Sequence, residues 1–217
     1  MSQDMLMLLV KSLGETVYMV TISMAIAAVI GVPLGVLLVT TAKNQILECV
    51  VFNRILAGVV NTVRSIPFII LMVAIIPFTR ILAGSSIGTT AAMVPLTIAA
   101  IPFIGRQVET SLREVDPGVV EAALSMGATP FQIIWHVLLP EAIGGIVSQL
   151  TTVVIGLVGS SAMAGAIGGG GLGDLAIRYG YQRFRPEVML ATVLVLVVLV
   201  QLVQFFGNRL ARKFDKK

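Results

Sequence analysis

The sequence predicts an all-α membrane protein with five transmembrane helices, and two observations lead to that fold class. First, 57% of the 217 residues are hydrophobic, only 12% are charged, and the mean hydropathy is +0.99. Soluble domains contain about 25% charged residues, so this composition lies outside their range. Second, several uncharged apolar stretches are long enough to cross a bilayer, which takes about twenty residues in a helix.

The predicted spans follow one another along the chain. Four are free of charged residues and cover residues 16–42, 81–105, 142–173 and 188–208. A fifth covers residues 55–79, where the one charge, Arg64, lies near an end and can extend to water. The first stretch lacks the basic lead and the short length of a signal peptide. We therefore expect a single membrane domain over residues 1–217, with a core of residues 12–207 and a basic tail at 208–217.

The basic residues predict the direction of the spans. An odd number of spans places the chain ends on opposite sides, and cytoplasmic segments are enriched in Lys and Arg. With the N-terminus outside, ten basic residues lie inside: Lys43, Arg54, Arg64, Arg106, Arg113, Arg209, Arg212, Lys213, Lys216 and Lys217. Five lie outside: Lys11, Arg80, Arg178, Arg183 and Arg185. We expect an N-out, C-in arrangement, and the cluster at residues 178–185 is the main evidence against it.

In that orientation residues 106–141 form a cytoplasmic excursion between the third and fourth spans. Asp116 followed by Pro117 is a strong helix start, with an N-cap carboxylate and a proline at the first helical position. Gly127 suits a left-handed cap at the other end. These signals predict a short helix over about residues 117–126 that turns sharply at Gly127.

A second helix is expected to begin at Thr129 and Pro130, run toward Leu139 and end before Pro140. The first short helix needs something to pack against, because a helix of this length is not stable alone in water. An anionic headgroup surface attracts Lys and Arg, yet neither occurs between Glu114 and Pro140. A cleft on another protein therefore suits this acidic and apolar helix better than a lipid surface.

The excursion resembles the coupling region in permease subunits of binding-protein-dependent ABC importers with the type I fold. That family has a Glu-Ala-Ala motif, a glycine six residues after the Glu, and a hydrophobic-x-Leu-Pro ending. The matching residues are Glu121, Ala122, Ala123, Gly127, Val137, Leu139 and Pro140, with Val137 where isoleucine is usual. In the family this stretch is the coupling helix, which docks into a groove of a separate ATP-hydrolysing subunit. The resemblance implies that role for these residues.

The resemblance extends over nearly the whole chain, through residues 61–80, 126–142 and 165–173, and points to permeases of methionine importers in particular. It implies two copies of this chain, two ATPase subunits, an external substrate-binding protein and the inner membrane of a bacterium. It implies L-methionine as the solute, with D-methionine open as a second one. Another amino acid, a peptide or an oxyanion remain alternatives, as do an ATP-independent gated channel and a membrane scaffold.

Other functional classes find little support. The chain has no Gly-Lys pair and hence no P-loop, so the energy of ATP must enter through another subunit. One cysteine, Cys49, and one histidine, His136, exclude a Cys/His metal cluster, and no catalytic set, cofactor or nucleic acid is expected. Gly168, Gly170 and Gly173 fit a dinucleotide fingerprint, but they follow a membrane helix and not a strand. We interpret them as a close-packed loop or a contact for the binding protein.

The fourth predicted span is rich in small and polar residues, which let helices approach closely. It directly follows the excursion, so a displacement there would reach this span first. We expect Ser160, Ser161 and Met163 to line the translocation path near its outer gate, with Met163 as a flexible plug. No span carries a fixed charge near the bilayer centre. We therefore expect alternating access with weak substrate binding by the permease and selection by the external binding protein.

Overall fold

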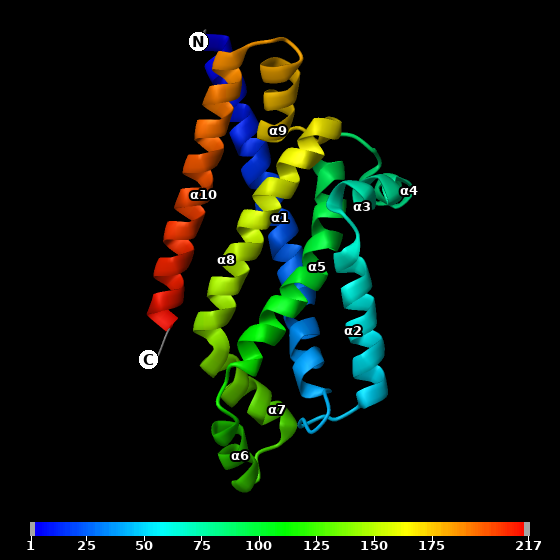
Figure 1. Ribbon diagram of the computed structural model, residues 1–217, viewed down its shortest axis with the longest axis vertical. Coiled ribbons are helices and arrows are strands. Elements are labelled where there is room, and N and C mark those ends of the chain that lie inside the picture. The colour runs from blue at the N-terminus through cyan, green and yellow to red at the C-terminus, as the bar shows by residue number, and fades with distance from the viewer. Residues whose placement is uncertain (1–2, 215–217) are drawn as a thin grey trace. The chain divides into compact units, whose positions relative to one another are not determined.

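A computed structural model describes residues 3–214, which are helical apart from short turns (Figure 1). The α-helices are α1 (Gln3–Thr40), α2 (Val50–Ser65), α3 (Phe68–Ala74), α4 (Ile76–Ala83), α5 (Thr89–Arg113), α6 (Pro117–Ser125), α7 (Pro130–Ile133), α8 (Leu139–Ala164), α9 (Gly171–Leu175) and α10 (Pro186–Phe214). The π-helical segments are η1 (Ile134–Leu138), η2 (Gly165–Gly169) and η3 (Ala176–Tyr181). Lys216 and Lys217 of the predicted basic tail lie outside the described residues.

The described residues contain four helical runs that are long and apolar enough to cross a membrane. These are α1, α5, the run Pro130–Gly169 and α10. Helices α2 and α3 together meet the same criteria but are bent by 99° at the break between them. The all-α fold class is confirmed, and the count of five spans holds when this bent pair is included as one broken span.

The predicted span over residues 55–79 is broken and sharply bent. Helix α2 ends at Ser65, and α3 starts only after Pro67. Proline disfavours helical geometry in the residue before it, here Ile66, so the helix stops at this point. Residues 76–83 then form α4, which ends at Gly84 with a left-handed φ of 71°. Hydropathy alone cannot reveal these breaks, because all three helices are apolar.

Two further boundaries differ from the prediction. Helix α1 begins at Gln3 and not near residue 16. Lys11 and Glu15, whose charges suggest a boundary, lie one turn apart on α1 with their side chains 3.9 Å from each other. Such a pair is compatible with helix, so the charges do not end it. Helix α5 begins later than residue 81, because residues 76–83 belong to α4.

The chain divides into two compact units, and α1, α5, α8 and α10 each contribute residues to both. The first unit comprises Met1–Ala27, Ile66–Ala100 and Val154–Gln204. Met19, Leu96 and Leu172, from α1, α5 and α9, are fully buried within it. Ser23 of α1 donates a hydrogen bond of 3.3 Å to the carbonyl of Met93 in α5. Apolar packing and one buried polar contact therefore join α1 and α5 here.

The second unit comprises Ala28–Ser65, Ile101–Val153 and Phe205–Lys217. Within it, fully buried Ile104 and Val108 of α5 lie against Gly31 and Gly35 of α1. A Cβ atom at Gly31 would lie 2.7 Å from Ile104, and one at Gly35 would lie 2.6 Å from Val108. Only glycine allows so close an approach. The contact fixes the part of α5 from which the excursion extends.

Candidate functional site

Helix α6, the predicted coupling helix, begins as the sequence predicts. The carboxylate of Asp116 accepts a hydrogen bond of 2.8 Å from the backbone N–H of Gly118. Pro117 occupies the first helical position, where its missing N–H costs nothing. The carboxylate also lies at the positive end of the helix dipole. The start of α6 is therefore fixed by its own local sequence.

The corner after α6 also follows the prediction. Gly127 has a left-handed φ of 80°. Its N–H donates to the carbonyl of Leu124 at 2.9 Å, and the N–H of Ala128 donates to the carbonyl of Ala123 at 3.1 Å. This pair of bonds is the Schellman arrangement that ends helices at a glycine. Gly127 thus sets the angle at which the chain leaves α6.

The second helix of the excursion begins at a capping box. The N–H of Gln132 donates to the Thr129 hydroxyl at 3.4 Å, and the N–H of Thr129 donates to the Gln132 side-chain oxygen at 2.9 Å. The prediction that this helix ends before Pro140 is wrong. The helix widens into η1, where the N–H of Leu139 donates to the carbonyl of Ile134, and continues as α8. The wider turn accommodates a proline that cannot donate the α-helical hydrogen bond.

The excursion presents an exposed surface that is apolar and acidic. Its exposed large apolar side chains are Val119, Leu124, Met126, Phe131 and Trp135. Glu121 and Ala122 are exposed among them, and Met126 is 82% exposed. Large apolar side chains gathered on one surface mark a contact site. Of the predicted coupling residues, Glu121, Ala122 and Gly127 therefore lie where a partner can reach them.

The matched motif is divided between this surface and the interior of the excursion. Glu121, Ala122 and Gly127 are exposed, Ala123 is buried, and Val137, Leu139 and Pro140 are half-buried. Helix α6 packs against α7 and η1, α6 and α7 lie next to each other in Figure 1, and Ala123 is the buried residue of α6. Only the first alanine of the motif is therefore free for close approach by a partner. The second alanine, Ala123, is small enough to let α6 pack closely against α7 and η1.

A charged cluster on α5 supports the base of the excursion, and sequence reasoning missed it. The buried carboxylate of Glu109 pairs with Arg106 at 2.5 Å and with Arg113 at 2.9 Å. Arg106 also donates to the side-chain oxygen of Asn61 in α2 at 2.9 Å. The positions of the three charges, three and four residues apart, are the signal that points to such a cluster. It ties α2 to the part of α5 that leads into α6.

Arg64, the one charge inside a predicted span, has a structural contact. It lies in the last turn of α2 and is exposed. Its guanidinium carbon lies 5.0 Å from the ring centroid of Phe103 in α5. A cation over an aromatic face is stabilised there, most strongly where water is excluded. This contact agrees with the interpretation of Arg64 as a structural and not a substrate-binding residue.

The three predicted gate residues occupy different environments at the end of α8. Met163 is 51% exposed, Ser160 is half-buried, and Ser161 is 2% exposed with its hydroxyl donating to the carbonyl of Val158 at 2.7 Å. Gly159, one turn before Met163, has no atom within 4 Å of the place where a Cβ would lie. Met163 therefore belongs to an open face of α8, whereas Ser161 packs inside the unit.

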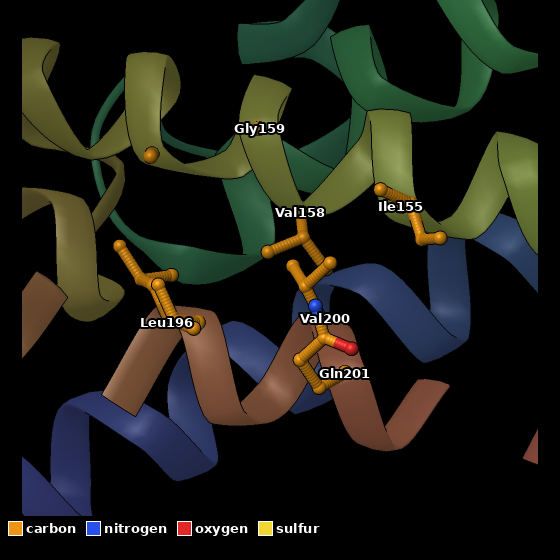
Figure 2. Close-up of a pocket in the computed structure, with 8 residues that line it drawn as sticks. Ile155, Val158, Gly159, Leu196, Val200 and Gln201 are labelled. Atoms are coloured by element: carbon orange, nitrogen blue, oxygen red, sulfur yellow. The ribbon is translucent and has the colours of Figure 1, made fainter. Parts of the chain in front are cut away.

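A groove of about 310 Å³ runs between α8 and α10. Figure 2 shows Ile155, Val158 and Gly159 of α8 facing Leu196, Val200 and Gln201 of α10 across it. Gln201 supplies the only polar side chain of its lining. No charge lines this groove, so it is suited to apolar groups and not to a free zwitterion.

The glycine run at residues 165–173 is packed and not open. The N–H of Gly171 donates to the carboxylate of Glu15 at 2.8 Å, and the N–H of Leu172 donates to the hydroxyl of Thr16 at 2.9 Å. A Cβ at Gly173 would lie 2.2 Å from the carbonyl oxygen of Ala162. The backbone donors that a dinucleotide phosphate requires at this turn are therefore already used. Sequence reasoning missed Glu15 and Thr16, whose only signal is polarity next to an apolar run.

The sequence matches the family described as binding-protein-dependent transport system inner membrane component over residues 31–217. A probable D-methionine transport system permease protein of Vibrio cholerae is 54% identical over 97% of this chain and 93% of its own length. The D-methionine transport system permease protein of Escherichia coli K12 is 51% identical over 76% of each chain.

Solved structures agree with these relatives. A chain of the MetNI methionine ABC transporter in an inward-facing conformation superposes with a TM-score of 0.97, at 49% identity and over 99% of both chains. An amino acid ABC transporter solved with histidines superposes with a TM-score of 0.78 at 20% identity, which supports the fold alone. The predicted type I permease fold is therefore confirmed.

Proposed function

Because the chain belongs to the family of inner membrane components of binding-protein-dependent transport systems, we propose that it is the membrane-spanning subunit of a bacterial methionine importer. The observation that carries this proposal is the 54% identity to a methionine permease across almost the whole chain. The coupling motif lies inside the matched region, and the exposure of Glu121, Ala122 and Gly127 supports a docking role. ATP hydrolysis belongs to a separate subunit.

In this proposal two copies of the chain, two ATPase subunits and an external binding protein form the importer. The exposed surface of α6 docks into a groove of the ATPase subunit. Its apolar side chains, led by Met126, fill the groove, and Glu121 supplies a polar anchor. The excursion carries no Lys or Arg after Glu114, which favours a basic or apolar protein groove over an anionic membrane surface.

The path of motion follows the chain from α6 to the gate. Gly127 fixes the angle between α6 and the next helix through a Schellman corner. From Thr129 the chain is helical without interruption through η1 and α8 to Ala164. Closure of the ATPase subunits on ATP would displace α6, and α8 would carry that displacement toward Met163. Ser160, Ser161 and Met163 remain the proposed gate residues, with Met163 the most open of them.

The N-terminus lies outside and the coupling surface inside the cell in this arrangement. Substrate selection rests with the external binding protein, since no predicted span holds a fixed charge near its middle to pair with a zwitterion. Another amino acid or small solute is the alternative within the same family. An ATP-independent channel is the alternative outside it.

Uptake into sealed vesicles tests the proposal. Vesicles containing the chain, its ATPase subunit and its binding protein should accumulate labelled L-methionine only with ATP, and unlabelled methionine should compete more strongly than other amino acids. A matched sample without the binding protein is the control. Uptake without ATP would support a channel, and stronger competition by a different amino acid would replace the proposed solute.

A further inference from the structure

The chain has a second unusual surface, at the N-terminal end of α10, which the proposed importer function does not use. Residues 176–185 connect α9 to α10 through η3 and a short turn. Phe184 lies in this turn, is 86% exposed and has a positive φ of 51°. A bulky residue rarely adopts this conformation, and such strain is found most often where a side chain is held for a function.

An apolar groove lies beside Phe184. It has a volume of about 740 Å³, within the range of about 300–1,000 Å³ typical of ligand sites. It is lined by Tyr181 and Phe184 of the connecting segment and by Met189, Leu190 and Val193 on the first turns of α10. Helix α10 is long and apolar enough to cross a membrane, and only 11% of its apolar window is buried. One side of the groove is therefore formed by a helix that can cross the membrane and that the rest of its unit covers little.

Arg183 and Arg185 flank the lining residue Phe184 in sequence, Arg178 lies in η3 just before them, and of the three only Arg178 is paired with a carboxylate within the described residues. Arg178 forms an ion pair with Asp174, which raises the pKa of its guanidinium above the ordinary value mainly through that hydrogen bond. Arg183 lies over the ring of Tyr179, 4.4 Å from its centroid. Within residues 3–214 neither Arg183 nor Arg185 has an ion pair, although Glu187 follows nearby in the sequence.

We propose that this groove binds an anionic phospholipid, with one acyl chain along Met189, Leu190 and Val193 and the phosphate at Arg183 and Arg185. A lipid fits the whole surface, because it alone joins a phosphate to a chain that reaches the flank of a membrane span. A water-soluble protein could contact the arginines and Phe184 but not the side chains of Leu190 and Val193 on the flank of a membrane-crossing α10. The lipid phosphate also supplies the counter-charge that this cluster lacks on the side of the membrane where arginines are rare.

The side chain of Phe184 can be removed without harming the fold. Glycine adopts a φ of 51° without strain, so Phe184→Gly should fold at least as well as the original chain. The exposed side chain has no packing role to lose. A drop in lipid binding in this variant would therefore come from the missing ring and not from misfolding.

Native mass spectrometry of the full-length chain in its membrane assembly tests the proposal. The probes are dioleoylphosphatidylglycerol, dioleoylphosphatidylcholine and glycerol phosphate. The anionic lipid should bind about tenfold more tightly than the zwitterionic one. Arg183→Gln or Arg185→Gln should each weaken binding of the anionic lipid about fivefold, because one basic residue near a membrane contributes about that factor to the affinity. Val193→Trp should block the groove, and Arg80→Gln, an exposed arginine away from it, should change nothing.

Several results would overturn the proposal. Equal binding of the two lipids, or an unchanged preference in the double variant Arg183→Gln/Arg185→Gln, would remove the phosphate contact. Displacement of the lipid by glycerol phosphate at equal concentration would show a free-phosphate site with no role for the groove. The variants could instead weaken only the binding of the external binding protein, measured in vesicles of pure phosphatidylcholine. The surface would then be a docking site for that protein and not for a lipid. The lipid results are independent of methionine import, whereas the last result would make this surface part of the importer's assembly.

Discussion

The carboxylate of Glu15, on α1, accepts a hydrogen bond of 2.8 Å from the backbone N–H of Gly171, which lies 156 residues further along the chain. The adjacent Thr16 hydroxyl accepts the next N–H, that of Leu172. Both donors belong to the first turn of α9, where backbone N–H groups have no partner within the helix. Two side chains near the beginning of the sequence therefore complete the turn that follows the glycine run.

Removal of the Glu15 carboxylate should destabilise this turn. We expect Glu15→Ala to lower the free energy of unfolding by about 1–2 kcal/mol, because a charged hydrogen bond is lost at a partly exposed site. Glu15→Gln should cost less, since its side-chain oxygen still accepts. Thermal unfolding in detergent measures the difference. Lys11→Ala is the matched control, because the Lys11 side chain is 72% exposed and its ammonium lies 3.9 Å from the Glu15 carboxylate. An equal loss of unfolding free energy in Lys11→Ala would contradict the capping role of Glu15.

The packing of the glycine run gives a second prediction. A Cβ at Gly173 would lie 2.2 Å from the carbonyl oxygen of Ala162, whereas no atom lies within 4 Å of one at Gly156 on α8. Gly173→Ala should therefore destabilise the chain by about 3 kcal/mol, the upper range for overpacking. Gly156→Ala should be neutral or stabilise α8 by up to about 1 kcal/mol. Similar melting temperatures for the two variants would mean that the run is not packed as described.

The excursion could be predicted from sequence because its signals are local. Asp116, Gly127 and Thr129 act within three or four residues of their own positions, through caps and a left-handed corner. Their geometry does not depend on the rest of the fold. The exception is Pro140, where the π-turn before it prevents the predicted helix end. Nothing in the local sequence distinguishes a proline that ends a helix from one that the helix accommodates.

The broken span and the partners of Glu15 could not be predicted, because they depend on distant or directional information. Hydropathy measures how apolar a segment is but not its direction, so the 99° bend between α2 and α3 leaves no trace in it. Pro67 is the local signal for a break, but it gives neither the angle nor the direction of the bend. Glu15 appeared as a boundary charge, since its partner lies 156 residues away. For the cluster around buried Glu109, the sequence shows only that three charged residues are spaced to share one face of a helix.

Gly127 provides a test of the corner that needs no assumption about the partner. No atom lies within 4 Å of a Cβ at this position, so a substitution acts through backbone conformation alone. Gly127→Val should strain the left-handed φ and reduce ATP-driven transport strongly, by about tenfold or more if the strain costs 1–3 kcal/mol. Gly127→Asn should retain most activity, because asparagine tolerates this conformation. Equal transport in the two variants would show that the left-handed conformation at Gly127 is not needed for transport.

Glu121 tests the docking surface. Glu121→Lys reverses an exposed charge on α6 and should abolish coupling, seen as loss of the ATPase subunit during purification or as ATP hydrolysis without methionine uptake. Insertion and thermal stability should not change, because the side chain is exposed. Glu114→Lys is the matched control, since Glu114 is also exposed but precedes α6. If both variants transport normally, α6 does not dock through this face.

Met163 and Ser161 together test the gate, because they lie only two residues apart on α8 but in opposite environments. Met163 is half-exposed on the open face, and Ser161 is buried with its hydroxyl bonded to the carbonyl of Val158. If the path follows the open face, Met163→Ala should raise methionine efflux from loaded vesicles without ATP, or ATP hydrolysis without uptake. Ser161→Ala should lower thermal stability by about 1 kcal/mol through the lost hydrogen bond, with no added leak. A leak in Ser161→Ala alone would place the path on the other side of α8, and no change in Met163→Ala by either measure would remove Met163 from the gate.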